Sequence, residues 1–346
     1  MRSAQVTIKD IAEQLGISPS TVSRALKDHP AISSITKKAV QELAETLGYE
    51  PNAVALSLRN SKSNNIGLII PEIIHYFFST VISGIEDVAN DAGYHVIICQ
   101  SNESYAREVK NVQALLSSRI EGLILSISKE TSSLDHLINL RKKNIPLVFF
   151  DRIPADFKAD HVIIDDFNGA YQAVKHLIDQ GCRQIAHLGT TKNMGIGRER
   201  YNGYIQALKD HHLILNEDLV VDCDTYKAAR LITRKLIHGS SPVDGIFAVN
   251  DRTAIGALQT AKECGVKIPE QMAIVGFSNG IYSNMTDPPL TSVEQFGYKM
   301  GQHAAQMLLN RLFSKEDYPP VKEVIKSELV VRGSTVIQAG FDSAKL

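Results

Sequence analysis

From residue 66 onward, short runs of apolar residues recur, and each is separated from the next by a segment long enough to form a helix. Continuous apolar runs of this length are typical of strands that are buried on both faces of a parallel sheet. Strands that alternate with helices predict βαβ units, and therefore doubly wound parallel sheets. The predicted strands are 66–70, 95–99, 122–127, 146–150, 161–165, 184–189, 219–223, 245–249 and 272–277.

These strands are too many for one such half, so the sequence predicts two similar α/β subdomains. After Thr291 the chain still offers a helix at 296–313 and a strand at 322–331, which we expect to return to the first subdomain. The expected parts are a first subdomain at about 64–160 and 293–332, a second at about 162–291, and a tail at 333–346.

The first 50 residues carry a different pattern, which predicts a helix, a tight turn and a second helix. Thr7 precedes the first apolar stripe and Asp10 follows three residues on, as in a capping box. Gly16 can adopt the positive φ of the turn at little cost. Ser18 then caps the second helix, and Pro19 takes its first position, where a missing N–H is harmless. The two stripes consist of Ile8, Ile11, Ala12, Leu15, Val22 and Leu26.

The exposed start of the second helix suits contact with base edges in a major groove. It presents Ser20, Thr21 and Arg24. A third helix is predicted between a cap at Ser33 and a terminator at Gly48. Helix-turn-helix patterns also arise by chance, so spacing alone leaves open a three-helix interaction domain that does not bind DNA.

The segments TIKDIAEQLGISPSTVSRAL and LGYEPNAVALSLR resemble the DNA-binding headpiece of the lactose-repressor (LacI/GalR) family of bacterial transcriptional regulators. The resemblance implies an all-α helix-turn-helix domain at 1–50, followed by a hinge helix and linker at 51–63. Two hinge helices of a dimer then enter the minor groove, and Leu58 takes the place of the leucine that wedges between base pairs. The expected DNA contacts are Thr7, Ser18, Pro19, Ser20, Thr21, Arg24, Asn52, Ala55, Leu58 and Arg59.

Residues 64–332 resemble the periplasmic-binding-protein-like core of these regulators, which implies a cleft for a small-molecule effector between the subdomains. Ligands of doubly wound sheets bind beyond the carboxyl ends of the strands, and this rule selects residues without the resemblance. Phe77 and Phe78 suit an ordinary core equally well. The main candidates that follow strands are Tyr76, Phe77, Phe78, Asn102, Ser128, Arg152, Tyr226, Asn250, Asp251, Ser278 and Asn279. The rule also selects Ile73, Ser101, Asp151 and Thr190.

The segment GIGRERYNGYIQAL resembles the family's R-x-x-G-aromatic helix start, which implies that Arg200 lies in the cleft. Arg198 lies two residues earlier and cannot share a helical face with Arg200, so it is the weaker candidate. Two solvated arginines at a helix start are the alternative interpretation. Asp166 is expected to serve the fold rather than the effector.

The loop after 272–277 departs from the family pattern. Many members that bind neutral sugars carry an aspartate there, whereas this chain has Ser278 followed by Asn279. Loss of that negative charge removes a strong acceptor and relieves repulsion of an anionic ligand. A uronate or a phosphorylated sugar is therefore one hypothesis for the effector, beside a neutral sugar.

Other classes of protein find little support in the sequence. No apolar run approaches the roughly 18 residues of a membrane span, and the N-terminus lacks the apolar region of a signal peptide, so we expect a cytoplasmic protein. The four cysteines show no C-x-x-C pairing, and no metal site is expected. The glycine-rich, nucleophile-elbow and H-E-x-x-H motifs of enzymes are missing.

We therefore expect a regulator, not an enzyme: a homodimer that binds a pseudo-palindromic operator and acts as a repressor of carbohydrate-utilisation genes. Its ligand would be a sugar, a sugar acid or a sugar phosphate, with no cofactor. A sugar-binding protein without a DNA role is the alternative. The sequence determines neither the operator, nor whether the ligand releases DNA or promotes its binding, nor the choice between dimer and tetramer.

Overall fold

The computed structural model describes residues 6–49, 63–154, 157–191, 194–239, 243–314, 316 and 318–336. The chain divides into two compact units, residues 1–63 and 64–346. We call the first unit the headpiece and the second the core.

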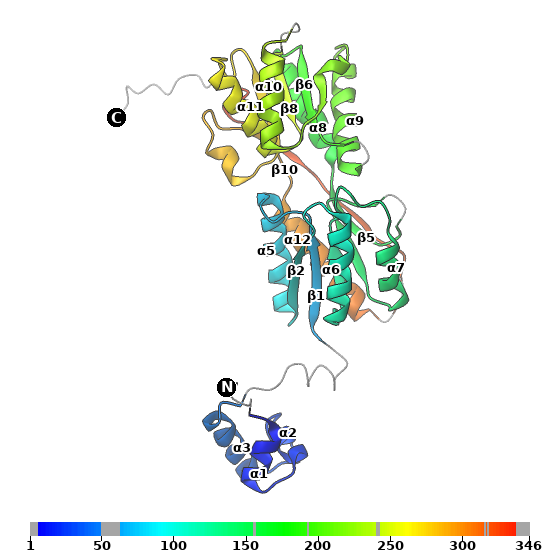
Figure 1. Ribbon diagram of the computed structural model, residues 1–346, viewed down its shortest axis with the longest axis vertical. Helices are drawn as coiled ribbons and strands as arrows, with labels where there is room; N and C mark the ends of the chain where they lie inside the picture. The colour runs from blue at the N-terminus through cyan, green and yellow to red at the C-terminus, as the bar shows by residue number, and fades with distance from the viewer. Residues whose placement is uncertain are drawn as a thin grey trace, which may run out of the picture. The chain divides into compact units, whose positions relative to one another are not determined.

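The headpiece contains three helices, as the sequence predicts: α1 (Ile8–Leu15), α2 (Pro19–Ala25) and α3 (Ser34–Thr46) (Figure 1). At the start of α1, the backbone N–H and the hydroxyl of Thr7 donate to Asp10 Oδ2 at 2.7 and 2.8 Å. Gly16 ends α1 with a φ of 63°. Six side chains form the small apolar core of this unit: Ile11, Ala12, Val22, Ala25, Val40 and Ala44.

The core contains two six-stranded sheets, and all nine predicted strands are confirmed. The first sheet is parallel, in the order β11-β5-β4-β3-β1-β2. It consists of β1 (Asn65–Ile70), β2 (His95–Gln100), β3 (Gly122–Leu125), β4 (Leu147–Phe150), β5 (Asp160–Ile164) and β11 (Lys322–Ile325).

The second sheet has the order β12-β10-β9-β8-β6-β7, and β12 is its antiparallel edge strand. It consists of β6 (Ile185–Gly189), β7 (Val220–Asp222), β8 (Gly245–Ala248), β9 (Ala273–Ser278), β10 (Thr291–Glu294) and β12 (Glu328–Val330).

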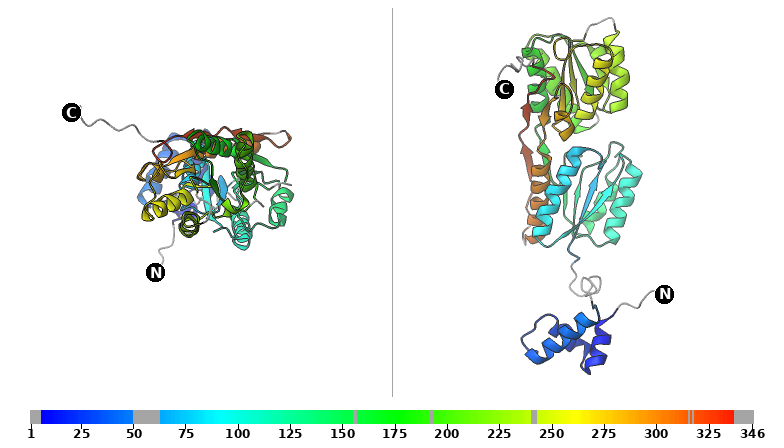
Figure 2. Two further views of the ribbon diagram at one scale, coloured as in Figure 1. Left: turned by 90° about the horizontal axis from the view of Figure 1, so that it is seen from above. Right: turned by 90° about the vertical axis from the view of Figure 1, so that its left-hand side faces the viewer.

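Helices cover both faces of each sheet, so both subdomains are doubly wound (Figure 2). Around the first sheet lie α5 (Tyr76–Asp91), α6 (Tyr105–Ser117), α7 (Asp135–Lys142) and α12 (Gly297–Phe313). Around the second lie α8 (Asp166–Asp179), α9 (Gly195–Asp210), α10 (Tyr226–Ile237) and α11 (Asp251–Glu263), with the short 3-10 helices η1 (Glu217–Leu219) and η2 (Ile281–Asn284).

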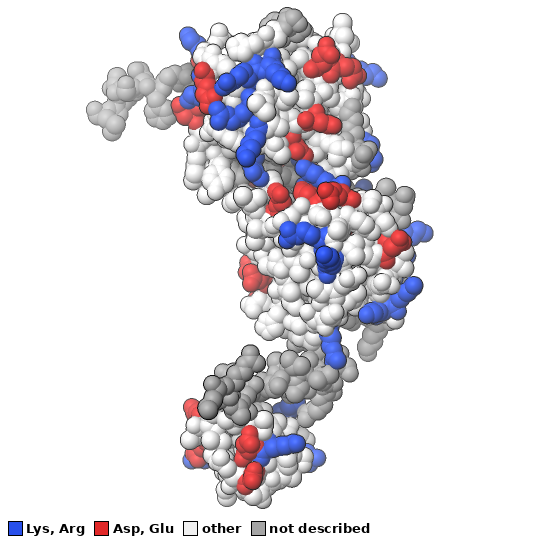
Figure 3. Space-filling view, viewed as in Figure 1, with Lys and Arg blue, Asp and Glu red and all other residues white. Residues whose placement is uncertain are grey.

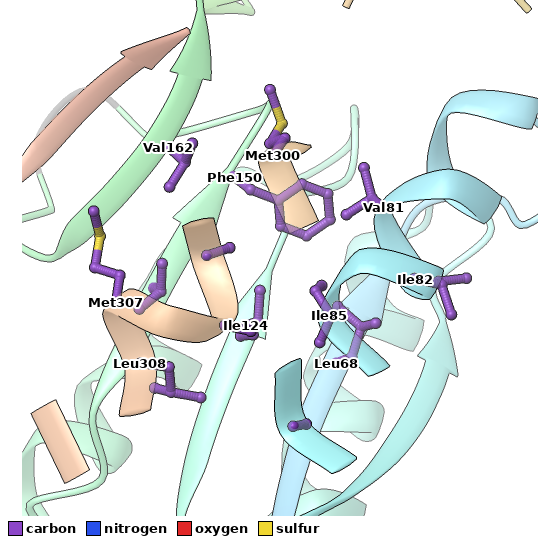
Figure 4. Packing of buried hydrophobic residues seen from close by; sticks show 14 of the residues in the cluster. Leu68, Val81, Ile82, Ile85, Ile124, Phe150, Val162, Met300, Met307 and Leu308 are labelled. Carbon is purple, nitrogen blue, oxygen red and sulfur yellow. The ribbon is translucent and has the colours of Figure 1, made fainter. Parts of the chain in front are cut away.

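The helices α5 and α12 pack on one face of the first sheet. Figure 4 shows Val81 and Ile85 of α5 and Met300 of α12 around the strand residues Leu68 and Phe150. The opposite face packs against α6 and α7. Burial on both faces explains why these strands are continuous apolar runs, since neither side of the sheet meets water.

The exchange of strands between the subdomains differs from the sequence prediction. We expected 161–165 to open the second subdomain, yet β5 pairs with β4 and β11 in the first sheet. The expected strand 322–331 is two strands, because the chain leaves the first sheet after β11 and enters the second as β12. β10 also belongs to the second sheet. These strands lie where the chain crosses between subdomains, and apolar patterning does not record which sheet supplies the partner strand.

The expected tail from 333 begins inside the second subdomain. Ser334 is buried, and its hydroxyl donates to the Ile274 carbonyl at 2.6 Å and accepts from the Thr291 N–H at 2.8 Å. Thr335 is also buried and shares a hydroxyl hydrogen bond of 2.7 Å with Thr291. Among the described residues, no helix combines the length and apolar character needed to span a membrane.

Candidate functional site

The first site is the exposed start of α2 in the headpiece. Ser18 Oγ accepts from the Thr21 N–H at 3.1 Å, and it lies 2.7 Å from Ser20 Oγ. Pro19 occupies the first helical position. Val22, on the opposite side of α2, is fully buried against the other two helices and fixes its orientation.

Several expected DNA contacts are exposed at the start of α2, and another expected contact is used to cap α1. Ser18, Pro19, Ser20 and Arg24 are exposed and Thr21 is half-buried. The Thr7 hydroxyl is used in the capping box of α1. The remaining expected contacts lie outside the described residues: Asn52, Ala55, Leu58 and Arg59.

The second site is a cavity of about 440 Å³ between the two subdomains of the core. It lies beyond the carboxyl ends of the strands of both sheets, as expected for doubly wound folds. Eight of the main candidates from the sequence line it: Tyr76, Phe77, Phe78, Arg152, Arg200, Asn250, Asp251 and Ser278.

Five other main candidates do not line this cavity. Ser128 is buried and donates to Glu108 Oε2 at 2.8 Å, and Arg198 is exposed beside Glu199. Asn279 is engaged by Glu294 and Arg332, each at 2.6 Å. The side chain of Asn102 accepts from Gln100, and the Tyr226 hydroxyl donates to Gln259.

The sequence prediction took the residues directly after each strand as ligand contacts, which we call the strand-end rule. In several places this rule selected a residue one or two positions away from the one that lines the cavity. Glu103 and Lys129 line the cavity, whereas their neighbours Asn102 and Ser128 do not. Asn102 and Glu103 both lie in a turn with positive φ, so the direction of each side chain is set by that turn and not by the strand that precedes it. The other polar residues of the lining that the sequence prediction left out are Glu72, His75, Asp224, Thr225, Arg252 and Gln295.

Arg200 is held rigidly at the cavity wall. Its Nη1 donates to the Val249 carbonyl at 2.6 Å, and its Nε and Nη2 each lie 2.7 Å from Asp166 Oδ1. The guanidinium also lies 3.7 Å from the centre of the Phe277 ring. Burial raises the pKa of Asp166, and the neighbouring Arg200 opposes that rise. Asp166 therefore positions Arg200 and does not itself line the cavity; that it serves the fold rather than the effector stays a prediction.

Arg152 and Asp151 occupy the opposite wall, directly after β4. Arg152 Nη1 donates to both carboxylate oxygens of Glu103, at 2.8 and 2.7 Å. Asp151 is buried and has a φ of 57°. Burial raises the pKa of Asp151 to about 6, although the adjacent Arg152 opposes this.

Asp251 fixes the turn that carries Ser278. Its Oδ2 accepts from the Gly280 N–H at 2.7 Å, and its Oδ1 accepts from Ser292 Oγ at 2.5 Å. Ser278 has a φ of 127°, so the turn is held in a conformation that a serine rarely adopts. Burial raises the pKa of Asp251 to about 6, and its two hydrogen bonds limit the rise.

The aromatic residues divide between the cavity and the core. Phe77 and Phe78 line the cavity but are largely buried. Phe78 packs edge-on against Phe150, in the hydrophobic interior of the first subdomain. Tyr76 is partly exposed and can present a ring face to a ligand. Each phenylalanine therefore belongs both to the hydrophobic interior of the first subdomain and to the wall of the cavity.

The charged groups of the cavity are largely paired with each other. Arg152 is bound by Glu103, Lys129 by Asp224, and Arg200 by Asp166. Figure 3 shows acidic and basic side chains interspersed on the visible face of the core. Five carboxylates and four cationic side chains line the cavity: Glu72, Glu103, Asp151, Asp224, Asp251, Lys129, Arg152, Arg200 and Arg252.

This arrangement offers hydrogen-bond donors and acceptors at close range, with a ring face beside them. Such a set can bind the hydroxyl groups of a small polar ligand. Within the described residues, no group of three or more His, Cys, Asp or Glu side chains could hold a metal ion.

Two family models match the chain. The model described as "Bacterial regulatory proteins, lacI family" matches residues 7–52, and the model "Periplasmic binding protein-like domain" matches residues 174–335. The two matches cover the helix-turn-helix headpiece and most of the second subdomain described above.

Relatives match along almost the whole chain. A ribose operon repressor of Halalkalibacterium halodurans is 34% identical over 95% of this chain and 97% of its own length. The HTH-type transcriptional repressor PurR of Vibrio campbellii is 31% identical over 95% of this chain and 98% of its own length. Among solved structures, a LacI family transcriptional regulator from Enterococcus faecium with bound ribose is 27% identical, with a TM-score of 0.69 over 78% of this chain and 98% of its own.

These matches exclude the two alternatives that the sequence left open, a headpiece that does not bind DNA and a core without a DNA role. The chain belongs to the lacI family of bacterial regulatory proteins, and it is a ligand-responsive, DNA-binding transcriptional regulator rather than an enzyme.

Proposed function

We propose that this regulator responds to a neutral sugar, bound in the cavity between the subdomains, and controls genes of carbohydrate use. The observation that carries the proposal is the charge pairing of the cavity. Lys129, Arg152 and Arg200 each already contact a carboxylate. A neutral polyol can hydrogen-bond to such pairs without adding a charge that needs a counter-ion.

An anionic effector meets an unfavourable electrostatic environment in this cavity. The lining contains more carboxylates than cations, and Asp166 adds a further acid behind Arg200. Among the described cations of the lining, Arg252 is the one without a carboxylate contact, so a desolvated anion would have a single cationic partner against the excess of carboxylates, which disfavours it. The relatives support a sugar as well, since one is named a ribose operon repressor and one solved structure contains ribose.

A sugar acid or sugar phosphate is the second candidate. The presence of Ser278 where many sugar-binding members carry an aspartate favours it, because a negative charge is lost at that point of the lining. Asp251 lies close by, but its two carboxylate oxygens already accept hydrogen bonds from Gly280 and Ser292. We favour the neutral sugar because the excess of carboxylates over cations in the whole lining outweighs the loss of one negative charge at Ser278.

We further propose that the protein acts in the cytoplasm as a homodimer on a pseudo-palindromic operator. Two headpieces would then place their α2 helices in successive major grooves, with Ser20 and Arg24 at base edges. A hinge at 51–63, with Leu58 as the minor-groove wedge, would connect the headpiece to the core. Two exposed apolar side chains on and beside η2 support a contact with a second copy: Ile281 and Met285.

Calorimetric titration tests the effector class. The purified protein is titrated with neutral pentoses and hexoses, with uronates and with sugar phosphates. Arg200→Ala should abolish binding, while Arg198→Ala is the matched control, since Arg198 is exposed and does not line the cavity. Binding by anionic sugars alone would replace the neutral-sugar proposal with the second candidate.

Operator binding in the presence of the sugar then tests the regulatory coupling. A ligand that changes DNA affinity by a given factor must have its own affinity changed by the same factor by DNA. Equal DNA affinity with and without the bound sugar would show that this sugar is not the effector.

A further inference from the structure

One ion pair joins the two subdomains across the cavity. Lys129 follows β3 of the first subdomain, and Asp224 follows β7 of the second. Lys129 Nζ lies 2.5 Å from Asp224 Oδ2, and the two side chains are 31% and 21% exposed. The pair is thus partly withdrawn from water. In this partly buried position its charge interaction is screened less than it would be on an open surface.

Each partner is held in place by its own subdomain. The Lys129 backbone N–H donates to Glu103 Oε2 at 3.0 Å, and Glu103 is itself bound by Arg152. On the other side, Asp224 Oδ2 accepts from Thr190 Oγ1 at 2.6 Å, and the Asp224 carbonyl accepts from Asn250 at 3.0 Å. Both loops are therefore preorganised, so formation of the pair orders the Lys129 side chain but requires little rearrangement of the backbone.

The ionised form of Asp224 is favoured by these surroundings. Burial raises the pKa of Asp224, but the hydrogen bonds from Lys129 and Thr190, together with the positive charges of Lys129 and Arg152, lower it overall. The Asp224 carboxylate therefore stays ionised across the physiological range.

A second contact across the cavity is weaker. Arg252 Nη1 of the second subdomain lies 3.3 Å from His75 Nε2 of the first, and Glu72 Oε2 lies 3.0 Å from the same nitrogen. One imidazole nitrogen cannot donate to Glu72 and accept from Arg252 at once. Lys129–Asp224 is the shorter and better-supported of the two crossing contacts.

We propose that Lys129 and Asp224 form a latch that holds the two subdomains closed before the effector binds. The inference rests on the proposed function only in taking this cavity as the effector site. The effector contacts both walls, so it binds the closed form more tightly than the open form. A protein that is already closed spends less of the binding free energy on closure, and loss of the latch raises the apparent Kd.

The size of the effect follows from the fraction of closed protein. Apparent affinity falls in proportion to that fraction. For a partly buried pair of this kind we expect the apparent Kd of the effector to rise about three- to tenfold when Lys129 or Asp224 is replaced.

The latch can be measured without any effector by following the fluorescence of a tryptophan introduced at the cavity. The chain contains no tryptophan of its own, so the introduced residue is the only one that reports. Tyr76→Trp would place the chain's single tryptophan, which can be excited selectively over the tyrosines, on the first subdomain opposite Gly280 of the second, where a methyl group on Gly280 would lie 3.4 Å from Tyr76 Cβ. The side chain at this position is 41% exposed in the closed form, and opening of the cavity increases its exposure and therefore its quenching by acrylamide. The reporter variant is combined with Lys129→Met, with Asp224→Asn, or with the exchange Lys129→Asp/Asp224→Lys.

Lys262→Met in the same background is the matched control. Lys262 and Asp287 form an ion pair of 2.6 Å within the second subdomain, away from the cavity lining. The latch predicts stronger quenching in Lys129→Met and Asp224→Asn, and quenching close to that of the reporter protein in the exchange variant and in the control. Thermal melting confirms that each variant is folded.

Unchanged quenching in both single variants would overturn the latch, whatever the identity of the effector. Calorimetry on chains without the reporter tests the proposed function separately. A protein that binds none of the neutral sugars would refute the neutral-sugar proposal, and the quenching result would still decide whether the latch exists.

Discussion

Arg200 and Asp166 form a buried ion pair in which two guanidinium nitrogens each lie 2.7 Å from the same carboxylate oxygen. The side chains are 4% and 6% exposed. The pair joins the start of α8 to α9, and it fixes the guanidinium at the wall of the cavity. A residue that does not line the cavity therefore controls the geometry of one that does.

Replacing Asp166 by asparagine should lower the free energy of unfolding by about 3 kcal/mol, because a buried arginine loses its carboxylate partner. Urea denaturation measures the loss. Lys175→Met is the control, since it removes an exposed ion pair of 2.5 Å with Asp179, which solvent screens, and should cost far less. Equal losses in the two variants would contradict a structural role for the buried pair.

The raised pKa values of Asp151 and Asp251 predict the pH dependence of stability. Both are about 6 in the folded protein, above the value of roughly 4 in an unfolded chain. Between these values the folded state binds more protons, so the free energy of unfolding should rise as the pH falls from about 7 to about 5. Above the folded pKa the cost of burying both charges is fully present.

Asp251→Asn should flatten part of this slope in urea denaturation between about pH 5 and 7, because the amide does not titrate. Asp224→Asn is the control, since the pKa of Asp224 is lowered and its stabilising contribution is lost only at more acidic pH. A slope that is unchanged by Asp251→Asn would show that this carboxyl is not protonated near neutrality.

Gly84 lies where α5 crosses α12, and a Cβ atom there would lie 2.1 Å from the Tyr298 carbonyl oxygen. Backbone cannot yield as a flexible side chain can, so Gly84→Ala should lower the free energy of unfolding by about 1–3 kcal/mol or more. Gly195→Ala is the control, because a Cβ at the start of α9 meets open space. Chemical denaturation of both variants should place Gly195→Ala close to the unsubstituted protein.

Arg24 is exposed on α2, where a side chain can reach base edges. Arg24→Ala should cost about 1–3 kcal/mol of binding to an operator selected from random duplexes, if the guanidinium makes a bidentate base contact. Fluorescence anisotropy at fixed salt compares this operator with random DNA. A loss of the same size on both duplexes would assign Arg24 to the phosphate backbone, and Lys38→Ala on α3 provides the control for a change of charge.

Leu58 should act as the wedge between base pairs at the operator centre. Leu58→Ala removes the apolar group that unstacks the bases, so operator bending should decrease. Energy transfer between dyes at the two ends of the duplex measures the bend. A bend of the same size in the variant would remove Leu58 from this role.

Local signals determined much of this structure. Capping residues, a turn glycine and helical periodicity were enough to place the three headpiece helices. Continuous apolar runs were enough to place nine strands of the core, because burial on both sides of a sheet leaves a pattern within a few residues.

The candidate cavity was only partly predictable. The strand-end rule found Arg152, Asn250 and Ser278, since those positions follow directly from where a strand stops. It chose Asn102 and Ser128 where the structure uses Glu103 and Lys129. The choice between neighbours depends on how the loop turns after the strand, and that turn is set by contacts with other segments.

By itself the sequence determined the family, the three headpiece helices and nine strands of the core, because each leaves a signal within a short stretch of residues; that α2 faces DNA stays a prediction. The tertiary structure decided which sheet receives β5, β10 and β12. It also decided the pairings that organise the cavity, Asp166 with Arg200 across 34 positions and Lys129 with Asp224 across 95. These pairs form only when the crossing segments bring the ends of distant strands together, and no local pattern records that approach.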